Sequence, residues 1–215
     1  MTRWLMTLPL FTYFLIAQNP VSGKATIYFV EAGSLCDGAL KRIEVYVDIT
    51  GLIGQGGDAG LNAFSLFVTL DDPSFYVRSE SGTDPFSFDL TTTAPGRIST
   101  VGSLRLVGHK ADTLAPNQAY HVASIFLGNQ IGSVTLGLDI ANSSLGSRRV
   151  GGAGPGPIGM SFDGPLTVTI DTTSSIQISD AFPAWLTTSP GFDLQPPFGI
   201  VDILDLVAIA ECSAP

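Results

Sequence analysis

The chain has 215 residues, of which 45% are hydrophobic and 13% are charged, and its formal net charge is −9 at pH 7. This length accommodates one sizeable core, and the acidic balance disfavours nucleic acid as a partner because it repels phosphate backbones. All Lys and Arg residues lie at or before Arg149, so the last third of the chain is charged only by acidic side chains.

An export signal is predicted at the N-terminus. Arg3 precedes a mostly apolar run, Leu5 to Ala17, and small residues follow up to Ala25. The run is shorter than the about 20 residues that span a bilayer. We therefore favour a signal peptide over residues 1–25, cleaved between Gln18 and Thr26, to a membrane anchor. The mature protein is expected outside a bacterial cell or on its surface, without a membrane span.

Apolar and polar residues alternate in several segments of residues 26–173. In Ala63 to Leu70 the even positions are apolar and face a core, so Ser65, Phe67 and Thr69 are expected to face outward. The same alternation occurs in Arg42 to Ile49, Ser133 to Ile140 and Leu166 to Ile170. Segments of this kind, separated by Gly-rich and Pro-rich turns, predict an all-β antiparallel sandwich.

The pattern changes after residue 173. Residues 174–191 are rich in Ser, Thr and Pro and predict a linker, with Phe182 and Trp185 as apolar anchors. In the tail, residues 192–215, apolar side chains return at helical spacing, which predicts a short C-terminal helix from Ile203 to Glu211. Alone, a helix of this length is unstable. We expect it to bury Ile203, Leu204, Val207 and also Leu206, against the protein's own sandwich.

The two cysteines, Cys36 and Cys212, lie near opposite ends of the mature chain. In an exported protein they can form a disulfide that ties the tail to the start of the sandwich. Two unpaired thiols that pack as small hydrophobic groups are the alternative, and the sequence leaves both open.

No catalytic constellation is apparent, so an enzyme is not predicted. The two histidines, His109 and His121, are isolated, and His121 alternates within a strand-like segment. A calcium loop that places Gly199 at position 6 uses Asp202 and Asp205 as ligands. Positions 1, 3 and 5 then have no side-chain oxygen, so this loop is degenerate. No cofactor is expected, and calcium at this loop is the less favoured alternative.

The residues RIEVYVDITGL (Arg42 to Leu52) and GLNAFSLFVTLDDPSFYV (Gly60 to Val77) resemble the opening strands of cohesin modules. YHVASIFLGN (Tyr120 to Asn129) and GPLTVTID (Gly164 to Asp171) resemble later strands of that family. The resemblance implies a nine-stranded jelly-roll sandwich over residues 26–173 that binds a dockerin on one sheet face. The outward residues Ser65, Phe67 and Thr69 would contribute to that face.

GIVDILDLVAIA (Gly199 to Ala210) resembles half of a dockerin, a loop and a helix that dockerins carry twice. The resemblance implies that Ile203, Leu204 and Val207 contact a cohesin-like surface. Together these features predict an exported, non-catalytic, monomeric protein that binds a dockerin-like protein or its own tail. Two alternatives remain: a carbohydrate-binding module of a polysaccharide-degrading system, and a structural envelope protein.

Overall fold

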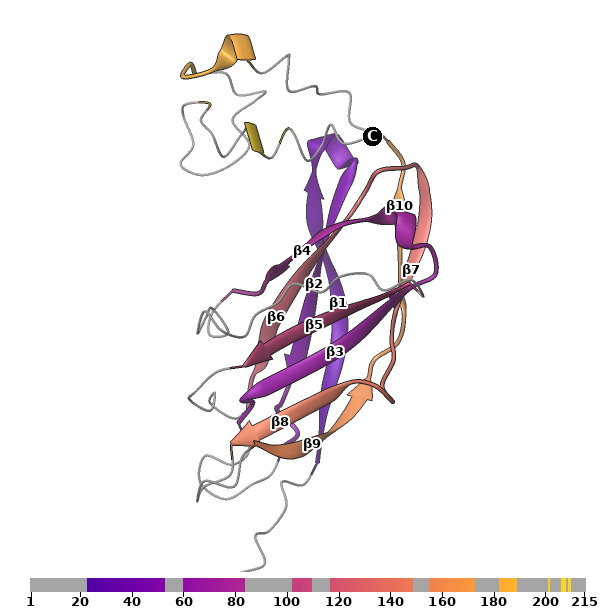
Figure 1. Ribbon diagram of the computed structural model, residues 1–215, viewed down its shortest axis with the longest axis vertical. Coiled ribbons are helices and arrows are strands. Elements are labelled where there is room, and N and C mark those ends of the chain that lie inside the picture. Colours follow the sequence, from indigo (N-terminus) through magenta and orange to yellow (C-terminus); the bar gives the residue numbers. More distant parts are fainter. Residues whose placement is uncertain are drawn as a thin grey trace, which may run out of the picture.

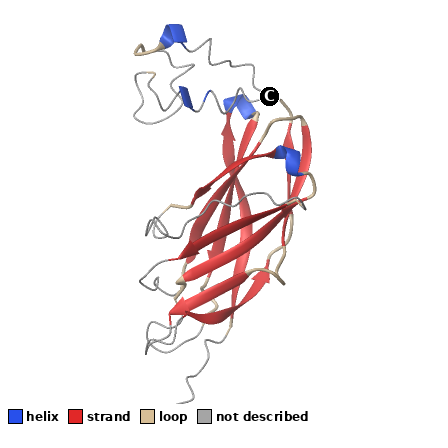
Figure 2. Cartoon of the chain, in the orientation of Figure 1, coloured by secondary structure: helices blue, strands red, loops and turns tan. Residues whose placement is uncertain are grey.

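In a computed structural model the protein is an elongated β-sandwich (Figure 1). The structure describes residues 23–52, 60–83, 102–109, 117–148, 155–172 and 182–188, together with Val201, Leu206, Val207 and Ile209. Ten strands account for most of these residues, and the helical pieces are short (Figure 2).

The strands form two layers, which we name after one strand of each. The β1 sheet contains β1 (Lys24–Leu35), β2 (Leu40–Asp48), β4 (Tyr76–Ser81) and β6 (Ala119–Leu127). The β3 sheet contains β3 (Ala63–Leu70), β5 (Ser103–His109), β7 (Gly132–Leu138), β8 (Ser144–Arg148) and β10 (Leu166–Ile170). Three single 3₁₀ turns complete the described elements: η1 (Cys36–Gly38), η2 (Pro73–Phe75) and η3 (Phe182–Ala184).

One strand joins the two layers. The first half of β9 (Pro155–Phe162) pairs antiparallel with β8, and its second half, from Gly159 to Phe162, pairs parallel with Lys24 to Ile27 of β1. The predicted all-β class is therefore confirmed, with ten strands where nine were expected and with one parallel pair among the antiparallel ones.

β3 lies inside the second layer. β5 pairs with it along Ala63 to Thr69. The opposite edge of β3 is shared by β8, which pairs with Ala63 to Ser65, and by β7, which pairs with Val68 to Leu70. Because both edges are occupied, the register of β3 determines which residues of its neighbours face the core.

The core lies between the inward faces of the two sheets. The even positions of β3 are buried, as their alternation predicts, and the odd positions are half-buried. Six side chains expected in the core are all fully buried: Val45, Val47, Leu66, Val68, Leu136 and Val168.

The beginning of β1 bears on the predicted signal peptide. β1 starts at Lys24, and Ala25 is fully buried in the core. Cleavage at or before the Gly23–Lys24 bond leaves this strand whole, whereas cleavage after residue 25 would remove a paired and buried part of it.

The predicted linker and tail contact each other. The Leu186 N–H donates to the Val201 carbonyl at 2.9 Å, and the Val201 N–H donates to the Thr187 carbonyl at 3.0 Å. Of the predicted helix Ile203 to Glu211, the structure describes only Leu206, Val207 and Ile209, so that helix stays a prediction. Within the described ranges, no helix has the length and apolarity needed to cross a membrane.

The alternation of β3 predicts an asymmetric response to mutation. Leu66→Ala should lower the free energy of unfolding by about 2–5 kcal/mol, because it leaves a cavity in a close-packed core. Thr169→Val, an exposed change on the outer face of β10, should alter it by no more than about 0.5 kcal/mol. Urea unfolding of both variants measures the difference, and equal losses would show that the inward face has been misidentified.

Candidate functional site

The outward residues of β3 lie where the sequence predicts them. Ser65, Phe67 and Thr69 all point away from the core and are half-buried. Thr69 lies beside Gly137 of β7, where an added Cβ would approach the Thr69 hydroxyl to 2.7 Å. Gly137 therefore leaves room for the Thr69 side chain on a closely packed outer surface.

Arg105 of β5 connects two of these residues. Its Nε donates a hydrogen bond to the Ser65 hydroxyl at 3.2 Å, and its guanidinium carbon lies 5.5 Å from the centroid of the Phe67 ring. Both contacts hold the cation over the strand. Sequence reasoning did not select Arg105, although alternation within Ser103–His109 places it outward beside Phe67.

Between its pairing with β8 and its pairing with β7, β3 forms backbone hydrogen bonds at Phe67 to the segment that connects those two strands. The Phe67 N–H donates to the Ser143 hydroxyl at 2.9 Å, and its carbonyl accepts from the Asp139 N–H at 2.9 Å. The segment from Asp139 to Ser143 therefore bulges away between β7 and β8. Ile140, within this bulge, is 43% exposed.

Hydroxyl groups cover the part of the face formed by β7 and β10. The hydroxyls of Ser133 and Thr169 are 3.0 Å apart, and those of Thr135 and Thr167 are 3.2 Å apart. These cross-strand pairs form a polar but uncharged surface.

Carboxylates are absent from the strands of this layer. None of β3, β5, β7, β8, β9 and β10 contains Asp or Glu, whereas β1, β2 and β4 contain Glu31, Glu44, Asp48 and Glu80. In the β3 sheet the acidic residues follow directly after strands, at Asp71, Asp139 and Asp171, and Asp163 follows the joining strand β9. The chain as a whole has 19 acidic residues, and the strands of the two sheets differ clearly in their carboxylate content.

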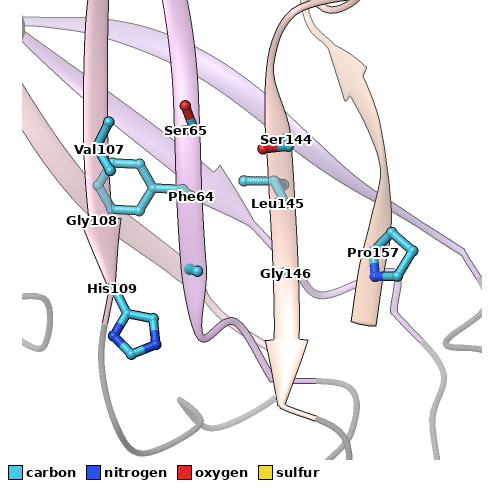
Figure 3. A pocket seen from close by; sticks show the side chains of 10 residues that line it. Phe64, Ser65, Val107, Gly108, His109, Ser144, Leu145, Gly146 and Pro157 are labelled. Atoms are coloured by element: carbon cyan, nitrogen blue, oxygen red, sulfur yellow. The ribbon is translucent and has the colours of Figure 1, made fainter. Parts of the chain in front are cut away.

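One end of the face is hollowed, with a volume of about 360 Å³ (Figure 3). Ala63 pairs with His109 on one side and with Gly146 on the other, and Gly146 pairs in turn with Pro157. Small residues on the two middle strands thus lie between larger ones on the two outer strands. Ser65 lies on the β3 strand at the inner end of this hollow.

The outer face of the β1 sheet is organised differently. The rings of Tyr28 and Tyr46 stack with their centroids 5.1 Å apart and their planes 5° apart, and the ring of His121 lies 5.4 Å from Tyr46. Stacked rings turn their faces toward each other instead of presenting a coplanar platform to a sugar. The Tyr46 hydroxyl also donates to Glu44 at 2.8 Å, which raises the pKa of Tyr46 to about 12.

His121 connects β6 to the end of β4, and its predicted position in a strand is confirmed. Its Nδ1 accepts from the Thr83 N–H at 3.3 Å, so the neutral ring carries its proton on Nε2, which lies 3.0 Å from the Ser124 hydroxyl. Only glycine fits at Gly82, because a Cβ there would lie 1.9 Å from the His121 carbonyl oxygen.

Most of the predicted tail sites lie outside the described residues: Asp202, Ile203, Leu204, Asp205 and Cys212. Val207 was expected to be buried, but it is 50% exposed, whereas Leu206 and Ile209 are buried. The expected burial was therefore wrong at Val207, whereas Leu206 is buried as expected.

The remaining predicted site features concern cysteine and metal. Cys36 is bonded in a disulfide. The only other cysteine of the sequence is Cys212. Among the described residues, no group of three or more His, Cys, Asp or Glu side chains could hold a metal ion.

Comparison with known proteins gives a limited result. No protein-family profile matches the sequence, and no curated protein matches it. The seventh ScaB type I cohesin from Pseudobacteroides cellulosolvens matches with a TM-score of 0.49 and 13% identity, covering 72% of this chain and 96% of that one. The sixth cohesin of scaffoldin B from Acetivibrio cellulolyticus, solved with a Cel5 dockerin mutant, gives 0.47 and 14%, covering 71% and 100%. These values are too low to assign the chain to that family.

The contact between His121 and Thr83 predicts a pH dependence. Burial lowers the pKa of His121 below its ordinary value of 6.5, although Glu44 opposes this shift. The unfolded chain therefore takes up the proton first as the pH falls. The stability that His121 contributes is fully present above about pH 6.5 and is lost as the pH falls below it toward the folded pKa.

Urea midpoints at about pH 7.5 and about pH 5.5 measure this effect. The wild type should lose more stability on acidification than His121→Gln, which does not titrate in this range. If the two proteins lose the same amount, the contact with Thr83 does not depend on a neutral ring.

Proposed function

We propose that this protein is an exported, non-catalytic binding module and that the outer face of its β3 sheet binds a partner protein. One observation carries the proposal: the six strands that form or border this face contain no carboxylate in a chain with 19 acidic residues.

The physical reason is the cost of desolvation. Burying a carboxylate in an interface without a hydrogen-bonding or charged partner costs roughly several kcal/mol of binding free energy. Burying a hydroxyl group costs less, because backbone groups or trapped water can satisfy its hydrogen bonds. Charged residues are accordingly depleted in the centres of protein interfaces. General avoidance of acidic residues in strands does not explain the pattern, because the β1 sheet contains four of them.

A dockerin-like protein is the partner class that we propose. This step rests on the sequence resemblance over Arg42 to Leu52 and Gly60 to Val77, which includes β3 itself. Ser65, Phe67 and Thr69 are the proposed contact residues. The degenerate loop at Asp202 and Asp205 leads us to propose that binding needs no calcium.

The tail is proposed to dock on its own sandwich. Val201, Leu206 and Ile209 are buried in the same chain, and we propose that Cys36 pairs with Cys212, the only other cysteine. We propose that a tail held in this way leaves the β3 face open to another protein and that the protein is a monomer.

A pair of matched variants tests the proposed face. Thr167→Asp places a carboxylate on the exposed outer face of the β3 sheet, and Val30→Asp places the same group at a residue of β1 that is 39% exposed. The wild type, the two variants and a chain lacking residues 192–215 are each immobilised and exposed to secreted proteins of the native host. Captured proteins are identified by mass spectrometry.

The wild type and Val30→Asp should capture the same protein, and Thr167→Asp should lose it, because the added carboxylate would have to be desolvated. Loss in Val30→Asp but not in Thr167→Asp would contradict the proposal. If capture requires residues 192–215 and neither substitution changes it, the tail and not the β3 face binds the partner.

A further inference from the structure

We propose that the hollow at the Ala63 end of the β3 face receives a large apolar side chain of the partner protein, and that Arg105 pairs with a carboxylate of the same partner segment. The inference rests on the proposed function, because it specifies the chemistry that this face recognises.

The shape of the hollow comes from the sizes of four paired residues. Its floor is formed by the methyl group of Ala63 and by Gly146, and the side chains of His109 and Pro157 flank the floor on the neighbouring strands. Adjacent strands are about 4.8 Å apart, so two small residues side by side leave a depression wide enough for one bulky side chain. Its volume of about 360 Å³ is near the lower end of the range for ligand pockets.

The lining favours an apolar occupant. Val107 and Pro157 contribute carbon atoms, Ala63 contributes a methyl group, and Ser65 and Ser144 contribute the hydroxyls at the inner end. No lining residue is acidic, so an apolar side chain that enters the hollow displaces water without leaving a buried charge unpaired.

Arg105 supplies a cation at the rim. Ser65 lines the hollow and also accepts the hydrogen bond from Arg105 Nε, so the guanidinium lies directly beside the depression. Among the described residues, Lys41, Arg42 and Arg78 form ion pairs with Glu31, Glu44 and Glu80, but Arg105 forms none.

This arrangement identifies the chemistry of the partner. Arg105 is fixed by Ser65 and Phe67 while its terminal amino groups can still meet a carboxylate in a bidentate geometry. Ala63, on the floor of the hollow, and Ser65, which holds Arg105, are two residues apart on β3 and so about 7 Å apart. This distance is close to the roughly 5.4 Å rise of one helical turn. A partner helix with a large apolar residue and an Asp or Glu one turn away therefore fits both features at once.

The test uses a phage library of a small helical scaffold that is randomised on one exposed face. The library is selected against the full secreted chain, and the enriched binders are then measured against three variants. Ala63→Leu fills the floor, Arg105→Gln removes the cation, and Val30→Ala is a control at an exposed residue of the β1 sheet, outside the proposed face. Thermal unfolding verifies that each variant is folded, which Ala63→Leu should be because Ala63 points away from the core.

Enriched binders should carry an Asp or Glu one turn from a large apolar residue. Their Kd should rise by about tenfold or more in Ala63→Leu and in Arg105→Gln, and should not change in Val30→Ala. Raising the salt concentration should weaken binding to the wild type but not to Arg105→Gln.

Several outcomes would overturn the inference. Binders that are enriched in Lys or Arg, or that bind Ala63→Leu as tightly as the wild type, would show that the hollow has another role. Wild-type protein that sediments as a dimer while Ala63→Leu sediments as a monomer would make a second copy the occupant. If Thr167→Asp abolishes native capture but Ala63→Leu and Arg105→Gln do not, the face functions without the hollow, and only this inference fails.

Discussion

The alternation of β3 is the constraint on which the rest of the structure depends. Its even positions are buried in the core, and its two edges are paired with β5, β7 and β8. A shift of its register by one residue would turn Phe64, Leu66 and their neighbours toward water and would bring Ser65, Phe67 and Thr69 into the core. The hydrophobic effect therefore fixes both the core and the identity of the outward face.

The packing of the core does not explain the residue composition of that outward face. Strand positions that face water accept charged residues, as the four carboxylates of the β1 sheet show. The β3 sheet instead carries hydroxyl pairs, one half-buried aromatic ring and one arginine held over that ring. A surface of this kind is hydrated in the free protein, and its desolvation costs less free energy than that of a surface with carboxylates. This combination connects the fold to the proposed binding of another protein.

Periodicity was sufficient to predict the sandwich and the outward positions of β3, because the alternation of apolar and polar residues within one strand shows which of its sides faces the core. It could not predict which distant strands become neighbours. Arg105 became part of the candidate site only through its register with Phe67, and the hollow arises only because Ala63 and Gly146, far apart in the sequence, are paired. The tail shows a limit of spacing alone: Val207 and Leu206 were both expected inside, but Val207 is 50% exposed, whereas Leu206 and Ile209 are buried.

The most direct measurement is methyl NMR of the Thr- and Val-labelled protein during titration with the protein captured from the native host. Thr69, Thr135 and Thr167 report on the β3 face, and Thr26 and Val30 report on the β1 sheet. The proposed function predicts shifts and broadening at the first three methyl groups and none at the last two. Perturbation of Thr26 and Val30 with unchanged signals from the β3 face would contradict it.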